Sequence, residues 1–128
     1  MQPERTIHIV DDDVDVRRSL KMMLQVSGFQ ATTFDGGPAF LGGLDGLCPG
    51  VVLLDLRMGG MDGLQVLAEL TRRKLGWPVI VMTGHGEPEV GEEAIAAGAA
   101  AFIEKPFDET LLFCFLDEAW LGRNGATA

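Results

Sequence analysis

At residues 51–55 the chain carries the sequence VVLLD, four apolar residues followed by an acid. A continuous apolar run of this length is typical of a strand buried on both faces, as in a parallel sheet. Similar runs occur at residues 6–10, 79–82 and 101–103, and a weaker one occurs at Gln30–Phe34. The sequence therefore predicts five parallel strands, of which the second has the least regular pattern.

Segments with helical periodicity lie between these strands. Val16, Leu20, Met23 and Leu24 recur at the spacing of one helix face, and Gly28 supplies a C-terminal stop. Four more helices are expected: a short one at residues 39–44, one after Asp62 with Leu64, Leu67, Ala68 and Leu75 on its apolar face, one from Pro88 to Ala97, and one that Asp108 caps and that ends near Leu121.

The length of 128 residues suits one domain. We expect this domain to cover residues 5–121, followed by a small and polar C-terminal tail, residues 122–128, that is flexible. Right-handed crossovers between the strands would place helices on both faces of the sheet. The predicted fold class is therefore α/β, a five-stranded parallel doubly wound sheet.

The charge balance limits the partners of the chain. Ten Lys and Arg residues against 19 Asp and Glu residues give a formal net charge of −9. This domain itself is expected to bind neither nucleic acid nor anionic lipid. Because no segment resembles a signal peptide or is long enough to span a bilayer, a cytoplasmic location is expected. Cys48 and Cys114 form no CxxC pair, which favours two unpaired thiols, buried or exposed, over a disulfide or a zinc site.

Polar residues follow the predicted strands directly. Residues 11–13, all Asp, follow the first strand, Asp55 the third, Thr83 the fourth and Lys105 the fifth. The carboxyl ends of parallel strands share one edge of the sheet, where open α/β sheets bind ligands. Converging carboxylates repel one another and favour a cation, and Mg²⁺ prefers oxygen ligands. Carboxylates, Mg²⁺, a lysine and a hydroxyl are the parts of a phosphoryl-transfer centre, in which an Asp can be the nucleophile.

Five motifs extend this pattern along nearly the whole chain. They are IVDDD at residues 9–13, LLDLRM at 53–58, MDG at 61–63, VMTGHG at 81–86 and FIEKPF at 102–107. In this order they resemble the receiver domain of two-component response regulators, a CheY-like superfamily, and the last two are most similar to FixJ-type receivers. The resemblance covers about residues 5–121 and implies a flavodoxin-like (βα)5 fold with the strand order 2-1-3-4-5.

The resemblance assigns a role to each acid at the sheet edge. Asp55 would be the phosphoryl acceptor and would also bind Mg²⁺. Asp12 would bind the ion directly, and Asp11 would contribute through a water molecule. The backbone carbonyl of Arg57 would be a further metal ligand.

The same resemblance assigns the response to phosphorylation to residues of the fourth and fifth strands. Thr83 would bond a phosphoryl oxygen, and Lys105 would pair with the phosphoryl group. Phe102 would change rotamer together with Thr83 as the switch. The peptide bond between Lys105 and Pro106 is often cis in this family.

The implied function is two-component signal transduction. A sensor histidine kinase would supply the phosphoryl group, and the domain would catalyse its own phosphorylation and dephosphorylation as a regulatory phosphoprotein, not as a metabolic enzyme. Phosphorylation would bias the segment from Thr83 to Gly98 between two conformations. The output would be transcription regulation through a DNA-binding domain or, alternatively, protein contact by a stand-alone receiver.

Three rival functions share part of the pattern. A calcium-binding loop after the first strand would need Gly and Glu at its sixth and twelfth positions, where the chain has Val16 and Met22. An aspartyl-nucleophile phosphatase generally has an acid two residues after its nucleophile, where Arg57 follows Asp55. A flavodoxin-like electron carrier would bind the FMN phosphate where residues 11–13 repel it. The regulatory phospho-acceptor is therefore favoured.

Glycines mark two departures from the family pattern. Gly59 and Gly60 follow the Met of the acceptor loop, where most relatives have Pro, so we expect a looser loop with consequences for self-dephosphorylation. Gly91 lies inside the helix that starts at Pro88 and costs about 1 kcal/mol relative to Ala. We hypothesise that this helix is marginally stable and repositions on phosphorylation.

The last helix has more apolar residues than one buried face uses. Residues 111–116 are all apolar and surround the helix. Either of two stripes can face the core: Leu112, Phe115, Leu116 and Ala119, or Phe113 and Trp120. The surplus predicts a partner surface, and a homodimer through the last two helices is one expectation.

Neither histidine is expected to be functional. His8 is flanked by Ile7 and Ile9 in a predicted strand, which favours a structural role. His85 lies near Thr83 in a Gly-flanked loop, where a residue without a role is favoured over one that tunes the site.

Overall fold

The structure, a computed structural model, describes residues 5–58, 62–84, 88–106 and 108–125. Its five parallel strands form one sheet in the order β2-β1-β3-β4-β5, which confirms the predicted fold class. The strands are β1 Thr6–Val10, β2 Gln30–Phe34, β3 Val51–Asp55, β4 Val79–Thr83 and β5 Ala101–Glu104. The helices are α1 Val14–Val26, α2 Gly37–Gly43, α3 Gly63–Arg73, α4 Pro88–Ala96 and α5 Glu109–Gly125, with a 3₁₀-helix at Leu44–Gly46.

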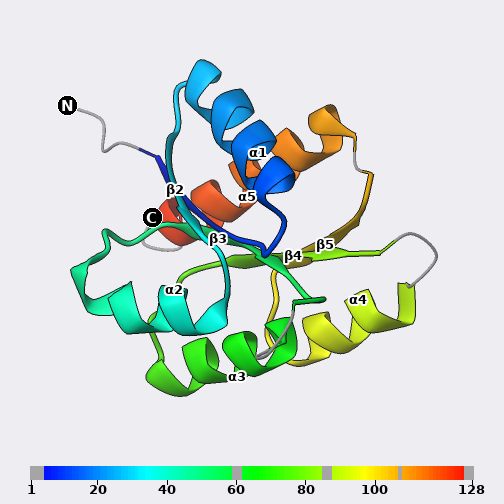
Figure 1. The fold of residues 1–128 in the computed structure, drawn as a ribbon. Coiled ribbons are helices and arrows are strands. Elements are labelled where there is room, and N and C mark those ends of the chain that lie inside the picture. Colours follow the sequence, from blue (N-terminus) through cyan, green and yellow to red (C-terminus); the bar gives the residue numbers. More distant parts are fainter. Residues whose placement is uncertain (1–4, 59–61, 85–87, 107, 126–128) are drawn as a thin grey trace.

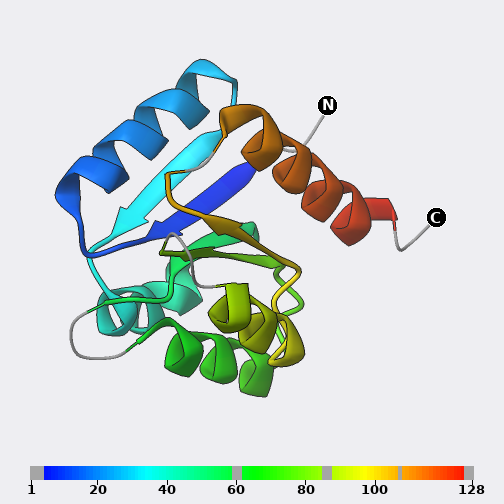
Figure 2. The same ribbon diagram turned by 90° about the vertical axis from the view of Figure 1, so that its right-hand side faces the viewer.

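Apolar layers cover both faces of the sheet. Helices α1 and α5 lie on one face, and α2, α3 and α4 lie on the other (Figure 1 and Figure 2). Leu53 of β3 packs into the first layer and Leu54 into the second. The layers also differ in their tryptophan, because Trp77 borders the layer of α2–α4 and Trp120 borders that of α1 and α5. A strand between two such layers has no solvent-facing side, which explains the unbroken apolar run in β3.

Most helix ends follow from the predicted capping residues. The Asp13 carboxylate accepts a hydrogen bond of 2.8 Å from the N–H of Asp15 at the start of α1. The Asp108 carboxylate accepts one of 2.7 Å from the N–H of Thr110 in α5. Gly28 follows α1 with a φ of 93°, a left-handed conformation that favours glycine. These contacts fix the directions in which α1 and α5 leave the sheet edge.

Helix α3 is shorter than its apolar pattern predicts. It ends at Arg73 because Lys74 adopts the left-handed conformation, with a φ of 55°. Leu75 therefore lies beyond the helix, and Ala68 is exposed on its outer face, so the prediction that these two residues line the buried side was wrong. The buried residues of α3 are Gly63, Val66, Leu67 and Leu70.

Two other helices also differ from their predicted bounds. Helix α2 begins at Gly37, ahead of the predicted residues 39–44, because Pro38 fits the first turn of a helix. Helix α5 continues to Gly125, so residues 122–125 of the predicted tail are helical. A glycine such as Gly122 weakens a helix without ending it.

Helix α5 packs against the sheet through the first of its two candidate stripes. Leu112 and Leu116 are fully buried, whereas Phe115 of the same stripe is only partly buried. Phe113 and Trp120 border the same apolar layer from the side. Although α5 is the longest helix, neither it nor any other described helix is long and apolar enough to cross a membrane.

The His8 ring is fully buried in β1, in the layer of α2–α4. Its Nδ1 lies 2.5 Å from the Thr32 hydroxyl, its Nε2 lies 2.8 Å from the Cys48 carbonyl oxygen, and the ring stacks on Trp77. Burial lowers the pKa of His8 more than the hydrogen bond to Cys48 raises it. A neutral ring satisfies both contacts, in keeping with a structural role. The thiols of Cys48 and Cys114 are both free and exposed.

Candidate functional site

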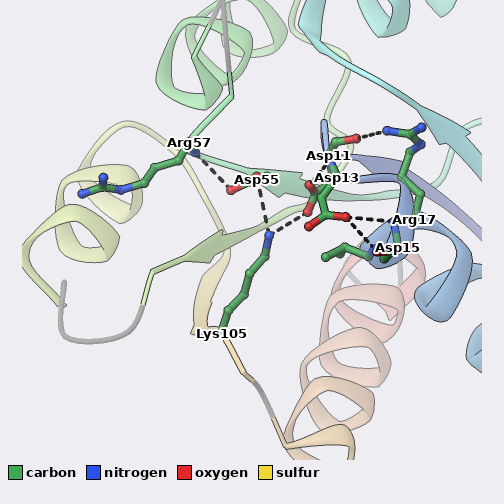
Figure 3. A network of polar contacts seen from close by, with 8 residues as sticks. Asp11, Asp13, Asp15, Arg17, Asp55, Arg57 and Lys105 are labelled. Carbon is green, nitrogen blue, oxygen red and sulfur yellow. Dashed lines mark hydrogen bonds and ion pairs between the residues drawn. The ribbon is translucent and has the colours of Figure 1, made fainter.

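Predicted site residues from several strands lie at one edge of the sheet, and Figure 3 shows Asp11, Asp55 and Lys105 together there. Asp11 and Asp12 directly follow β1, Asp55 is the last residue of β3, Thr83 is the last residue of β4, and Lys105 directly follows β5. Parallel strands that start in register at one edge end together at the other, which brings residues from the two ends of the chain into contact. The edge therefore collects acids, a hydroxyl and an ammonium group.

Three carboxylates form the centre of the site. One oxygen each from Asp11, Asp12 and Asp55 lies within 4.8 Å of the other two. Asp11 is completely buried and Asp55 is 6% exposed, whereas Asp12 is open to solvent. Three oxygen donors at this spacing, two of them shielded from water, suit a hard divalent cation. The cluster is thus able to bind a metal ion.

The ammonium group of Lys105 lies between two of these acids. Its Nζ is 2.7 Å from Asp11 Oδ2 and 3.5 Å from Asp55 Oδ2. The backbone N–H of Lys105 donates to the Thr83 carbonyl at 2.8 Å, and the following peptide bond to Pro106 is cis. Burial alone lowers the pKa of Lys105, but the hydrogen bond to Asp11 and the negative charges of both acids outweigh it and raise the pKa. The lysine is therefore positively charged at neutral pH.

Asp55 is held in an environment that disfavours its negative charge. The pKa of Asp55 is raised from 3.8 to about 6, and burial is the largest cause of this shift. The N–H of Arg57, which donates to Asp55 Oδ1 at 3.1 Å, opposes this shift; the charge of Asp11 adds to it and the charge of Lys105 opposes it. A carboxylate with a raised pKa is more basic, and is a better nucleophile than an ordinary surface acid. The exposed side chain of Arg57 extends away from this cluster (Figure 3).

The comparison with protein families agrees with this geometry. The model of the response regulator receiver domain matches residues 7–116. The chain belongs to this family. Receiver domains act in two-component signalling, where kinases phosphorylate them on an Asp.

Individual relatives of this receiver domain are FixJ proteins. It is 40% identical over 113 residues to the transcriptional regulatory protein FixJ of Bradyrhizobium diazoefficiens, covering 88% of this chain and 55% of FixJ. The identity to FixJ of Rhizobium meliloti is 42% over 114 residues, with 89% and 56% covered. The crystal structure of FixJ-N superposes with a TM-score of 0.86 at 42% identity, covering 93% of this chain and 94% of that one. The chain thus spans about half the length of the curated relatives it matches.

Two further predicted site residues of the receiver domain differ in burial. Thr83 is 2% exposed, and its hydroxyl has no hydrogen-bond partner within the described parts of the chain. The ring of Phe102 is partly buried and packs against the layer of α2–α4. A buried hydroxyl without a partner is costly, and such groups are rare in folded proteins. The Thr83 hydroxyl is therefore available to an acceptor that enters the site.

The position of the Phe102 ring explains why residue 91 of α4 is a glycine. A Cβ atom at this position would overlap the ring. We expect Gly91→Ala to lower the free energy of unfolding by about 1–2 kcal/mol, because the clash outweighs a gain of about 1 kcal/mol in helix propensity. Urea unfolding would measure the change. In a Phe102→Ala background the same substitution should instead stabilise the protein, and equal effects in both backgrounds would contradict the packing explanation.

Sequence reasoning missed one residue at the site and could not place others. Arg17 in α1 donates from Nη1 to the Asp11 carbonyl oxygen at 2.8 Å. The available signal was a positive charge close to a helix N-terminus, where the helix dipole disfavours it. Gly59, Gly60 and His85, for which the sequence made predictions, lie outside the described residues.

Proposed function

We propose that this receiver domain accepts a phosphoryl group on Asp55 from a sensor histidine kinase, in a reaction that depends on Mg²⁺. The observation that carries the proposal is the convergence of Asp11, Asp12, Asp55 and Lys105 at one edge of the sheet. Asp55 combines burial with a raised pKa, which suits a nucleophile. The domain is a phospho-acceptor that catalyses its own modification, not a metabolic enzyme.

In the proposed transfer a carboxylate oxygen of Asp55 attacks the phosphorus atom of the donor. The new oxygen–phosphorus bond gives an acyl phosphate, and the bond to the donor breaks with its electron pair left on the donor. The N–H of Arg57 orients the attacking carboxylate through its hydrogen bond to Oδ1. Lys105, whose Nζ is already 3.5 Å from Asp55, pairs with the added phosphoryl oxygens. Later attack by water on phosphorus releases phosphate and restores the carboxylate.

The metal site follows from the same acids. Asp12, Asp55 and the backbone carbonyl of Arg57 would bind Mg²⁺ directly. Asp11 suits a contribution through water, because its two carboxylate oxygens already accept hydrogen bonds from the loop backbone and from Lys105. Bound Mg²⁺ supplies positive charge that offsets the charge of the phosphoryl oxygens.

The proposed switch uses the hydroxyl of Thr83, which has no hydrogen-bond partner among the residues that the structure describes. Phosphorylation adds roughly two negative charges and several acceptor oxygens next to this group. Thr83 then donates to a phosphoryl oxygen and moves toward Asp55, and Phe102 changes rotamer with it. Because the Phe102 ring packs against Gly91, a rotamer change would release its contact with α4. The segment from Thr83 to Gly98 is the part of the domain that this change would reposition.

The output is proposed from the relatives. The matched FixJ proteins are transcriptional regulators, and the chain matches only about half of their length. This favours control of transcription by an output domain over a stand-alone receiver, with DNA contact made outside this acidic domain. A homodimer through α4 and α5 stays a prediction. The exposed apolar side chains of Ile95, Leu111 and Leu121 would form its interface.

Labelling with a small acyl phosphate tests the proposed function. We expect wild-type protein with Mg²⁺ to gain about 80 Da, the mass of one phosphoryl group, and peptide mapping to place it on Asp55. Chelation of the metal should slow labelling strongly, because the carboxylates would then repel the donor phosphate. Equal labelling rates with and without Mg²⁺, or modification at another residue, would contradict the proposal.

A further inference from the structure

Arg17 makes an unexpected contact at the start of α1. Its guanidinium donates from Nη1 to the carbonyl oxygen of Asp11 at 2.8 Å, reaching back over the first turn of the helix (Figure 3). A cation at this end of a helix is disfavoured by the helix dipole. The helix start is already capped by Asp13, whose carboxylate accepts from the N–H groups of Asp15 and Val16. Helix stability therefore does not explain the presence of Arg17.

The contact completes the hydrogen bonding of Asp11. The N–H of Asp11 donates to the Phe34 carbonyl at 3.1 Å, and its Oδ1 accepts from the N–H of Asp13 at 2.9 Å. Its Oδ2 accepts from Lys105 at 2.7 Å. The remaining polar group of Asp11 is its backbone carbonyl oxygen, which accepts the hydrogen bond from Arg17. Asp11 is thus fixed from β2, from its own loop, from the β5–α5 connection and from α1.

Fixing the Asp11 carbonyl also fixes the next residue. A peptide unit is planar, so the carbonyl group of Asp11 and the N–H and Cα of Asp12 lie in one rigid plane. The orientation of that carbonyl consequently sets the position from which the Asp12 side chain starts. Asp12 is exposed, and burial therefore contributes little to holding its carboxylate beside Asp11 and Asp55.

We propose that Arg17 is a positioning residue for the metal site: it holds the Asp11–Asp12 peptide so that the Asp12 carboxylate faces the other two acids. The inference rests on the proposed Mg²⁺ site and adds a residue to it. Partners that orient metal ligands from behind typically change metal affinity 10- to 100-fold when they are removed.

A pair of adjacent arginines allows a matched test. Arg17→Met removes the guanidinium but keeps the apolar stem and a similar helix propensity. Arg18→Met makes the same change in charge one residue further along α1, at an exposed side chain. Each variant would be titrated with MgCl₂, and the backbone amide resonances of Asp12 and Asp55 would be followed by NMR. Urea unfolding in the absence of metal would be measured in parallel.

We expect Arg17→Met to weaken Mg²⁺ binding about tenfold and to shift the Asp12 amide resonance before metal is added. Arg18→Met should bind Mg²⁺ like the wild type, and Arg17→Lys, which keeps one donor group, should recover part of the affinity. Equal affinities of Arg17→Met and Arg18→Met would overturn the inference but leave the metal site standing. A loss of affinity explained by unfolding of Arg17→Met would overturn it as well. Wild-type protein that does not respond to Mg²⁺ would refute the metal site and the role of Arg17 together.

Discussion

An Asp55→Asn variant is expected to take up no phosphoryl group from an acyl phosphate and, at pH 7, to be more stable than the wild type. The amide is not a nucleophile for phosphorus under these conditions, so labelling should stop. Asn has the shape of Asp and keeps an oxygen that can accept from the Arg57 N–H, a contact now of 3.1 Å. The substitution therefore removes the reaction without removing the local packing.

The gain in stability follows from the pKa of Asp55. The folded protein raises this pKa to about 6, mainly through burial, so the folded chain holds its proton at pH values where the unfolded chain has lost it. Wild-type stability should therefore decline as the pH rises from about 4 through about 6. Asn cannot titrate, and the variant lacks this decline. At pH 7 we expect a difference of roughly 1–3 kcal/mol in the free energy of unfolding, measured with urea and without divalent metal.

Asp45→Asn is the matched control for this prediction. Asp45 is exposed in the short helix that follows α2, away from the sheet edge that holds Asp55. Asp45→Asn changes the net charge by the same amount as Asp55→Asn. Because Asp45 is exposed and lies away from the site, its substitution should leave both the labelling and the pH dependence of stability unchanged. An Asp55→Asn protein that is no more stable than Asp45→Asn at pH 7 would show that burial of the charged Asp55 carboxylate does not destabilise the folded protein.

Gly63→Ala is expected to cause the largest loss of stability among single substitutions near the site. Gly63 opens α3 directly against the end of β3, and its N–H donates to the Leu56 carbonyl at 3.1 Å. A Cβ atom would lie 2.5 Å from the Asp55 carbonyl oxygen and 2.6 Å from Leu56 Cα. These are backbone atoms of the last residue of β3 and of the residue after it, which cannot rotate away as a side chain can. We expect a loss of about 3 kcal/mol or more, together with slower labelling of Asp55.

Gly42→Ala makes the same substitution where space is free. Gly42 lies in α2, and a Cβ atom there would meet nothing within 4 Å. Its stability should stay the same or rise by up to about 1 kcal/mol, through helix propensity. Urea unfolding of the two variants side by side gives the comparison. A Gly63→Ala protein within about 0.5 kcal/mol of wild type would show that α3 can shift without cost at the acceptor loop.

The sheet and its polar edge were predictable because each depends on local sequence. An apolar run such as residues 51–54 needs two covering layers, and the acid that ends it must then lie at the carboxyl edge. The convergence of Asp11, Asp55 and Lys105 followed from that rule and from the family motifs. The pKa shifts of Asp55 and Lys105 could not be predicted, because burial and contact distance depend on how the edge is packed.

Other features depended on contacts that a single sequence does not encode. Helix α3 stops where Lys74, and not a glycine, adopts a left-handed conformation, so no residue signalled the stop. The role of Gly91 depends on a ring from a neighbouring strand, and the sequence alone predicted only a weak helix. Arg17 acts through a long side chain that reaches a backbone carbonyl. None of these features follows from a residue pattern in the sequence, because each depends on a backbone conformation or a side-chain contact of the folded chain.

The two tryptophans give each face of the sheet its own fluorescent group. Trp77 borders the layer that also contains Phe102, whereas Trp120 borders the opposite layer. Phenylalanine substitution of either one would leave a single emitter whose spectrum reports on one half of the domain. A rearrangement transmitted through Phe102 would then alter the emission of Trp77 first. The fluorescence spectra of the two variants would therefore show which half of the receiver responds to phosphorylation.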